Sequence, residues 1–166
     1  MINILVLYDT RSGNTKEMAE AVSKGSDELD YTKVRMMRVD EAESSDVEWC
    51  HGLAVGTPTH CGLLTWKLKR FFDDEILDIW GNIDGKIGTA FSTSGGLGGG
   101  NELASTSVLN ILMNYGFLGF GLTDYASEDV TGHYGAVAVD SPSESEREMC
   151  KILGKRLAEY SKKIFG

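Results

Sequence analysis

Six residues near the start of the chain, TRSGNT from Thr10 to Thr15, have side chains suited to holding a ligand. Short hydroxyl or amide groups occur at Thr10, Ser12, Asn14 and Thr15. The stretch follows the apolar run INILVLY and precedes a helical pattern, so it is predicted to be a strand-to-helix turn. A helix N-terminus presents unpaired N–H groups and a partial positive charge, and Gly13 lets the backbone close tightly around a ligand. These residue types predict a site for one phosphate group.

Two better-known phosphate motifs are missing from this turn. It lacks the G-x-x-x-x-G-K-[ST] pattern of nucleotide hydrolases, which argues against a triphosphate with Mg²⁺. It also lacks G-x-G-x-x-G, which argues against a dinucleotide pyrophosphate. The alternative to a phosphate site is that Ser12 or Asn14 simply caps the helix and that the other hydroxyl groups are incidental.

The elements that would position this turn alternate between strands and helices along the chain. Apolar runs of strand length alternate with helical periodicity, and this order predicts one parallel sheet covered by helices on both faces. In such sheets ligands bind beyond the carboxyl ends of the strands. Three segments follow strands one, three and four and form the predicted site: DTRSGNT, TPTHCG and STSGGLGGG. The predicted strands are 2–8, 31–39, 52–57, 86–93 and 117–123, and the predicted helices are 15–29, 63–79, 102–115 and 143–164.

The composition restricts the classes of function. A chain of 166 residues, 42% of them hydrophobic, predicts one domain spanning 1–166 with an ample core. The net charge of −9 argues against nucleic acid as a partner. It permits steered encounter with basic protein partners, and the alternative is that the protein is simply acidic and soluble. No apolar run approaches the roughly 18 residues that a membrane span needs. Three cysteines do not suggest a disulfide scaffold, and no signal peptide precedes the first strand, so we expect a cytoplasmic protein.

The three loops resemble those of known flavin-binding families. T-x-S-G-N-T resembles the FMN-phosphate loop of flavodoxins, whereas GTPTHCG, FSTSGGLGGGNE and HYGA are similar to the flavodoxin-fold NAD(P)H:quinone oxidoreductases. The resemblance implies a flavodoxin-like three-layer α/β/α sandwich with a five-stranded parallel sheet in the order 2-1-3-4-5. It also implies non-covalent FMN and reversible electron carriage between redox partner proteins.

The resemblance assigns site residues as well. The first loop would hold the phosphate, and the second and third loops would line the isoalloxazine, with Tyr125 as a nearby aromatic residue. No catalytic residue and no metal ligand are expected. The residues expected at the cofactor are Thr10, Arg11, Ser12, Gly13, Asn14, Thr15, Pro58, Thr59, His60, Cys61, Gly62, Thr93, Ser94, Gly95, Gly96, Gly98, Gly99 and Tyr125.

Two departures from the quinone-reductase pattern bear on the choice of function. The connection between the second and third strands is short, where that family has an insertion that helps to build a tetramer. Tyr115 stands before Gly116 where that family usually has His. Both differences favour an electron carrier, either monomer or homodimer. The alternative is an FMN-dependent NAD(P)H:quinone oxidoreductase with NAD(P)H as the electron donor.

Two Cys-His pairs bracket the third strand without forming a metal site. Cys50-His51 and His60-Cys61 are separated by an extended segment of roughly 30 Å, far more than one coordination sphere spans. His60 faces either the flavin or solvent, and Cys61 is either a redox group or a small side chain tolerated in a loop. Gly62 is expected to allow a peptide reorientation when the flavin is reduced, since glycine adopts positive φ at little cost.

Several other residues keep two interpretations. Arg11 either contacts a phosphate or is solvated. Trp66 lies off the apolar stripe of its helix, so it is either exposed near the mouth of the site or part of a dimer face. Trp80 is expected to pack structurally. His133 and Tyr134 follow the fifth strand and are candidates for a position near the flavin.

Overall fold

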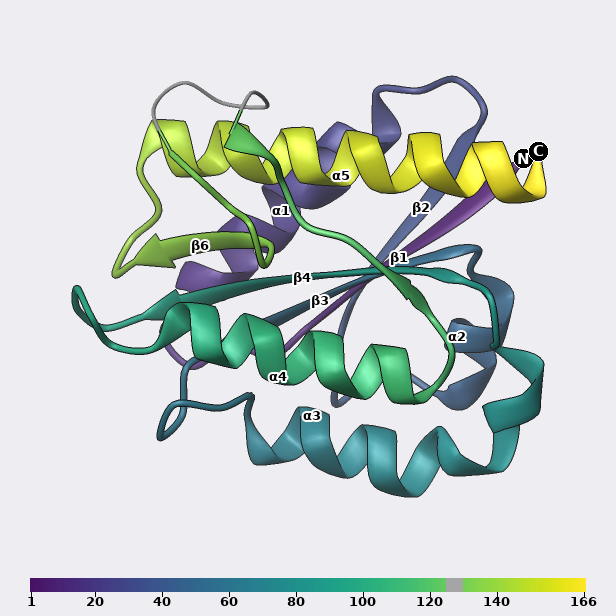
Figure 1. Ribbon diagram of the computed structural model, residues 1–166, viewed down its shortest axis with the longest axis horizontal. Helices are drawn as coiled ribbons and strands as arrows, with labels where there is room; N and C mark the ends of the chain where they lie inside the picture. Colours follow the sequence, from purple (N-terminus) through teal and green to yellow (C-terminus); the bar gives the residue numbers. More distant parts are fainter. Residues whose placement is uncertain (125–129) are drawn as a thin grey trace.

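The protein has three layers, with a parallel sheet between two layers of helices (Figure 1). The structure is a computed structural model, and it describes residues 1–124 and 130–166. The strands follow the order β2-β1-β3-β4-β5, and β6 also pairs with β4. This is the predicted order 2-1-3-4-5. The strands are β1 (Ile2–Tyr8), β2 (Thr32–Arg38), β3 (Gly52–Pro58), β4 (Ile87–Ser94), β5 (Leu118–Gly119) and β6 (Ala136–Val139).

The helices divide between the two faces of the sheet. In Figure 1, α1 and α5 cover one face, and α2, α3 and α4 lie on the other. The last helix begins at the predicted Ser-Pro-Ser signal, where Ser143 and Glu146 form a reciprocal capping box. The α-helices are α1 (Asn14–Asp27), α2 (Ser44–Trp49), α3 (Trp66–Arg70), α4 (Asn101–Asn114) and α5 (Glu144–Phe165). No helix in the described part of the chain is long and apolar enough to cross a membrane.

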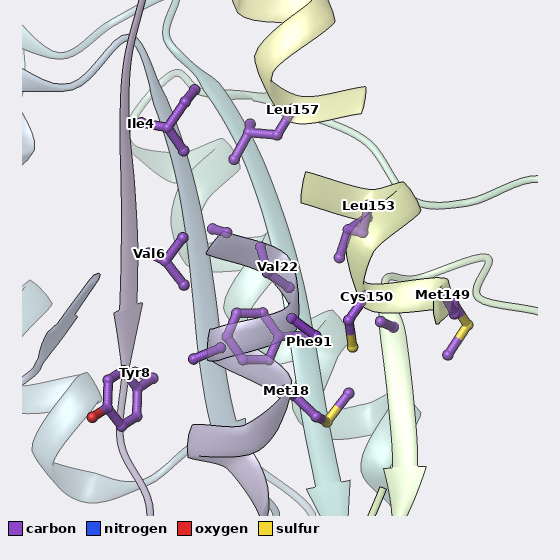
Figure 2. Packing of buried hydrophobic residues seen from close by; sticks show 14 of the residues in the cluster. Ile4, Val6, Tyr8, Met18, Val22, Phe91, Met149, Cys150, Leu153 and Leu157 are labelled. Atoms are coloured by element: carbon purple, nitrogen blue, oxygen red, sulfur yellow. The ribbon is translucent and has the colours of Figure 1, made fainter. Parts of the chain in front are cut away.

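The burial of each strand follows from its position in the sheet. All eight residues of β4 are buried, as are most of β1 and β3, because helices cover both of their faces. Most residues of β2 are only partly buried, which confirms the sheet edge predicted from its alternating basic residues. Figure 2 shows how side chains of β1 and β4 meet those of α1 and α5 in one core.

Two glycines let α1 and α5 approach each other closely. A Cβ built on Gly25 would lie 2.0 Å from the carbonyl oxygen of Lys151, and a Cβ on Gly154 would lie 2.0 Å from that of Val22. The Ser26 hydroxyl donates to the Gly154 carbonyl across the same contact at 2.9 Å. Any side chain at either glycine would push the helices apart, and α1 carries the first predicted loop at its N-terminus.

The fifth position of the sheet differs from the prediction. The run 117–123 was predicted as one strand, but only Leu118–Gly119 pairs as β5, opposite Ile87 and Gly88. The second half of β4 pairs instead with β6, from Phe91 opposite Ala136 to Ser94 opposite Val139. The predicted fifth strand is therefore replaced by two short pieces that pair with the same neighbour, β4.

The predicted helix 63–79 is also broken into three pieces. After α3 the chain widens into a π-helical turn, η1 (Phe71–Glu75), and then tightens into a 3₁₀ segment, η2 (Leu77–Asn82). Phe71 and Phe72 are both buried although they are adjacent in sequence. The buried hydroxyl of Tyr115 donates to the Phe72 carbonyl at 2.5 Å, which supplies a partner for a backbone group in the irregular turn.

Candidate functional site

The three predicted loops meet at the carboxyl edge of the sheet and are joined by threonine side chains. Thr15, at the start of α1, has its hydroxyl oxygen 2.9 Å from that of Thr93 near the end of β4. The Thr93 carbonyl accepts from both the backbone N–H and the hydroxyl of Thr59, at 2.7 and 2.8 Å. One residue of the third loop therefore holds the first and second loops together.

The first loop leaves the N-terminus of α1 open to an anion. Gly13 is the N-cap residue, so the alternative that Ser12 or Asn14 caps this helix is wrong. Glycine has no side chain with which to cap, and its φ of +103° is one that other residues rarely adopt. The first intrahelical bond runs from Glu17 N–H to the Gly13 carbonyl at 3.0 Å. The N–H groups before Glu17 in this turn therefore have no partner within the helix, as an oxyanion site requires.

The side chains of this loop divide into buried and exposed groups. Thr15 is 1% exposed, whereas Arg11 and Ser12 are exposed to solvent. The Thr10 hydroxyl accepts from Gly13 N–H at 3.1 Å and so fixes the shape of the turn. The loop therefore combines a backbone held by the Thr10 hydroxyl with an exposed hydroxyl at Ser12, and these features fit a phosphate group.

Two carboxylates flank the loop: Asp9 opens the predicted segment DTRSGNT but was not among the expected cofactor residues, and Asp140 lay outside the predicted segments. Asp9 is buried, and its Oδ1 accepts from Thr10 N–H at 2.8 Å and faces Arg38 at 3.8 Å. Asp140 follows β6 and accepts from the Asn14 side-chain amide at 3.3 Å. Asp9 ends an apolar run and Asp140 precedes Ser-Pro-Ser, so the sequence signals at both positions were strand end and helix start.

The second loop is a tight two-residue turn. His60 N–H donates to the Leu63 carbonyl at 2.9 Å, and Leu63 N–H donates to the His60 carbonyl at 3.0 Å. Between them Cys61 and Gly62 have φ values of +51° and +80°. Positive φ at both central positions defines a type I′ turn. Cys61 is exposed and His60 is half-buried, and both lie at the rim of the site.

The third loop closes against the second. Gly99 N–H and the Ser94 hydroxyl both donate to the Gly96 carbonyl at 3.0 Å, which folds the loop back on itself. A Cβ on Gly100 would lie 3.6 Å from the Gly62 Cα, so the backbones of the two loops are in contact. The expected residues Pro58 to Gly62 and Thr93 to Gly99 are thus brought together at one edge.

The remaining candidates have different surroundings. Trp66 is 65% exposed and lies off the core, as predicted, and Trp80 packs edge-on against Tyr115 with ring centroids 5.1 Å apart. Tyr134 is half exposed and lines a depression of about 430 Å³ beside the glycine loop. Tyr125 lies outside the described residues.

The Cys-His pairs lie at opposite ends of β3. His51 precedes that strand, and its Nδ1 accepts from Asn3 N–H at 2.9 Å. His60 follows the same strand and belongs to the turn of the second loop. The two pairs are therefore separated by the length of the strand, as the spacing predicted.

Comparisons with known proteins agree with this geometry. The family model for flavodoxin matches residues 6–137. A flavodoxin of Aquifex aeolicus is 59% identical over 161 residues, which cover 96% of this chain and 87% of that protein. An NAD(P)H dehydrogenase (quinone) of Methylocella silvestris is 28% identical over 201 positions covering both chains completely. The solved structure of a flavodoxin from the domain Archaea is 24% identical, with a TM-score of 0.79 over 97% of this chain and 99% of that one.

The class of protein follows from the fold and these similarities: it is an electron-transfer flavoprotein that binds FMN. The chain belongs to the flavodoxin family. The alignment with the quinone dehydrogenase is 35 positions longer than this chain of 166 residues, so the more distant relatives carry segments that this chain lacks.

Proposed function

We propose that the three loops at the carboxyl edge of the sheet form the FMN site. The phosphate would lie at Thr10–Thr15, and the isoalloxazine would lie between Pro58–Gly62 and Thr93–Gly99. The observation that carries this assignment is that α1 begins at Gly13, which has no side chain to cap the helix. The N–H groups of the first turn are therefore left for a ligand, next to the hydroxyl groups of Thr10 and Ser12. Tyr125 is kept in the proposed set from the family resemblance alone.

The residues of this chain would bind and orient the cofactor, which supplies the redox chemistry when it is bound. The Thr59–Thr93–Thr15 links would keep the phosphate loop and the ring loops at a fixed separation. The net charge of −9 would make the addition of electrons at the site more costly and so lower the reduction potential.

A calorimetric titration of the apoprotein with FMN and with riboflavin tests the phosphate site. The two ligands share the isoalloxazine and the ribityl chain but differ in the phosphate, so riboflavin should bind more weakly. Charge-assisted hydrogen bonds are worth about 1.5–3 kcal/mol each, and two of them would separate the affinities by more than about a hundredfold. Equal dissociation constants would show that the loop does not hold the phosphate.

We propose further that the protein carries electrons between redox proteins as a monomer or a homodimer. Its negative charge suits partners with a basic docking surface, for which association slows as salt screens the attraction. Sedimentation of the FMN-loaded protein distinguishes the two oligomeric states, and a mass of four chains would contradict both.

The alternative, NAD(P)H:quinone reduction, draws support from the 28% identity to the Methylocella silvestris dehydrogenase. Mixing the FMN-loaded protein with NADH or NADPH and a benzoquinone separates the two activities. A carrier should show slow or absent steady-state turnover with either nucleotide. Rapid turnover would make the protein a quinone reductase.

A further inference from the structure

Asp140 has a backbone conformation that a non-glycine residue seldom adopts. Its φ is +57°, and among the described residues only Cys61 shares a positive φ without being glycine. The left-handed region costs roughly 1–2 kcal/mol for most side chains, although Asp and Asn enter it more readily. Such strained residues gather at functional sites, where the surrounding structure holds them in place.

The backbone around Asp140 is held from two sides. Asp140 N–H donates to the Ser94 carbonyl at 2.7 Å, which extends the ladder between β4 and β6 by one bond. The preceding residue, Val139, donates its N–H to the Glu146 carboxylate at 3.3 Å. Glu146 is itself fixed by the capping box at the start of α5. These bonds hold the backbone where the Asp140 side chain meets the first loop.

The Asp140 carboxylate fixes the orientation of the Asn14 side chain. Asn14 Nδ2 donates to Asp140 Oδ1 at 3.3 Å. A carboxylate accepts hydrogen bonds and donates none, so the amide must turn its NH₂ group, and not its oxygen, toward Asp140. One N–H then bonds Asp140, and the other stays available as a donor. Without Asp140 the amide could present its oxygen, which would repel an anion.

We propose that Asp140 is a positioning residue for the phosphate of FMN, acting through the Asn14 amide. The inference rests on the proposed phosphate site. It also accounts for a carboxylate next to a loop that is built for an anion, because the cost of a nearby negative charge is offset by a correctly oriented donor. Asp140 and Ser94 further join this orientation to the third loop.

Two substitutions separate the carboxylate from the backbone conformation. Asp140→Gly keeps access to positive φ and removes the acceptor, whereas Asp140→Asn keeps tolerance for this φ but offers both a donor and an acceptor, so it no longer forces the Asn14 NH₂ group to face it. Asn14→Ala removes the oriented amide. The Asn14→Ala/Asp140→Gly double variant completes a double-mutant cycle, which measures whether the two residues act together. Glu41→Gln is the matched control for charge, since Glu41 is exposed just beyond β2 at the same edge of the sheet.

Dissociation constants for FMN and riboflavin are measured on each apoprotein, together with its thermal midpoint. Asp140→Gly should weaken FMN binding about threefold to tenfold, as expected for one hydrogen bond, and leave riboflavin binding unchanged. Asp140→Asn should weaken FMN binding by less than Asp140→Gly, because it allows the Asn14 amide both orientations. Glu41→Gln should stay within about twofold of the wild type, and the double variant should match Asn14→Ala to the same margin.

Three results would overturn the proposal. Asp140→Gly could bind FMN as tightly as the wild type or more tightly, which would make the carboxylate a bystander or a repulsive charge. The losses from Asn14→Ala and Asp140→Gly could multiply in the double variant, which would make them independent. A parallel loss of riboflavin binding, or a lowered thermal midpoint that accounts for the loss, would make Asp140 a structural residue. By contrast, equal affinity of the wild type for FMN and riboflavin would refute the phosphate site itself.

Discussion

The hydroxyl oxygens of Thr15 and Thr93 lie 2.9 Å apart, which joins the first turn of α1 to the end of β4. Both side chains are buried, at 1% and 4% exposure, so each is the other's partner in a place that bulk water barely reaches. Either hydroxyl can donate, and the other keeps a proton to direct elsewhere. The pair therefore links α1 to β4, and in the proposed FMN site its free proton would be available to the phosphate.

Thr15→Ala should lower both FMN affinity and the stability of the apoprotein. The proposed bond to phosphate would be worth about 1.5–3 kcal/mol, so the dissociation constant should rise about tenfold to a hundredfold. The Thr93 hydroxyl would also lose its partner, at a cost of roughly 1–3 kcal/mol in the free energy of unfolding. Titration with FMN measures the change in affinity, and urea unfolding measures the change in stability. Thr15→Ser keeps the hydroxyl, so both losses should be smaller than in Thr15→Ala.

Ser12→Ala should affect binding alone. Ser12 is exposed at the rim of the same loop, so the substitution should weaken FMN binding on the order of tenfold and leave unfolding nearly unchanged. Dissociation constants that stay at the wild-type value in both Ser12→Ala and Thr15→Ala would show that backbone N–H groups alone hold the phosphate.

The turn at Cys61 and Gly62 should respond to substitution in opposite directions. Gly62→Val places a Cβ on a residue with φ of +80°, and although that Cβ meets nothing within 4 Å, the backbone penalty is about 1–2 kcal/mol. Cys61→Asn introduces a residue that tolerates φ of +51° and should stabilise the turn by a few tenths of a kcal/mol to about 1 kcal/mol. Urea unfolding of the apoproteins measures both changes, and equal stabilities for the two variants would contradict the assignment of a type I′ turn.

Gly62 already has the positive φ that was expected to accompany flavin reduction. The proposed coupling between this glycine and the redox state stays a prediction. Reduction potentials of FMN bound to the wild type and to Gly62→Val test it, with Cys61→Asn as a control that changes the same turn without straining it.

Tyr115→Phe should destabilise the protein through the π-helical turn. The substitution keeps the ring and removes the hydroxyl that donates to the Phe72 carbonyl, leaving a buried acceptor unpaired. The expected loss is about 1–3 kcal/mol, or a fall of several degrees in the thermal midpoint at about 2–4 °C per kcal/mol. Tyr134→Phe is a matched control on a half-exposed tyrosine and should leave the midpoint close to that of the wild type.

The layers could be predicted because strands that are buried on both faces have continuous apolar sequences, whereas the strand order followed from the resemblance to flavodoxin-like proteins. The continuous apolar runs of β1 and β3 indicated interior strands, and the basic residues of β2 indicated an edge. The three loops at the site followed from those strand ends, since parallel strands end together.

What could not be predicted depended on partners distant in sequence. FLGFGLT has the composition of a strand, yet how far it pairs is decided by β4, which accepts β6 over its second half. The π-helical turn depends on Tyr115, more than forty residues away from Phe72. Asp140 became a site candidate only when the fold placed it against Asn14.

Alkaline pH should destabilise the apoprotein through two buried thiols. Burial raises the pKa of Cys50 to about 12 and also raises the pKa of Cys150, which lies in the core between the sheet and α5 (Figure 2). Above a pH of about 8.5 the unfolded chain loses these protons while the folded protein keeps them. The folded state then binds more protons, so the free energy of unfolding falls as pH rises, by about 1.4 kcal/mol per pH unit for each thiol once it is fully in this window.

Lys86 contributes with the opposite sign. Burial lowers the pKa of this lysine, so below about pH 10.4 there is a window in which the unfolded chain binds more protons and stability rises with pH. The thiols are isolated by comparing the wild type with Cys50→Ala/Cys150→Ala at pH 8, 9 and 10. The difference in unfolding free energy between them should change steadily with pH in favour of the variant. A constant difference would show that the thiols do not ionise selectively on unfolding.

The division of the fifth strand means that β5 and β6 are each held in the sheet separately. β5 and β6 each pair with β4 through their own residues. Leu122 N–H donates to the Gly132 carbonyl at 2.8 Å, so the chain is joined to itself at these two residues between the two strands. When the two ends of a segment are held together, the entropic cost of closing it grows only with the logarithm of its length. Doubling the length therefore costs less than about 1 kcal/mol. An insertion between Leu122 and Gly132 would therefore leave the register of both β4 pairs unchanged, although it would displace Tyr125 from its proposed place beside the FMN.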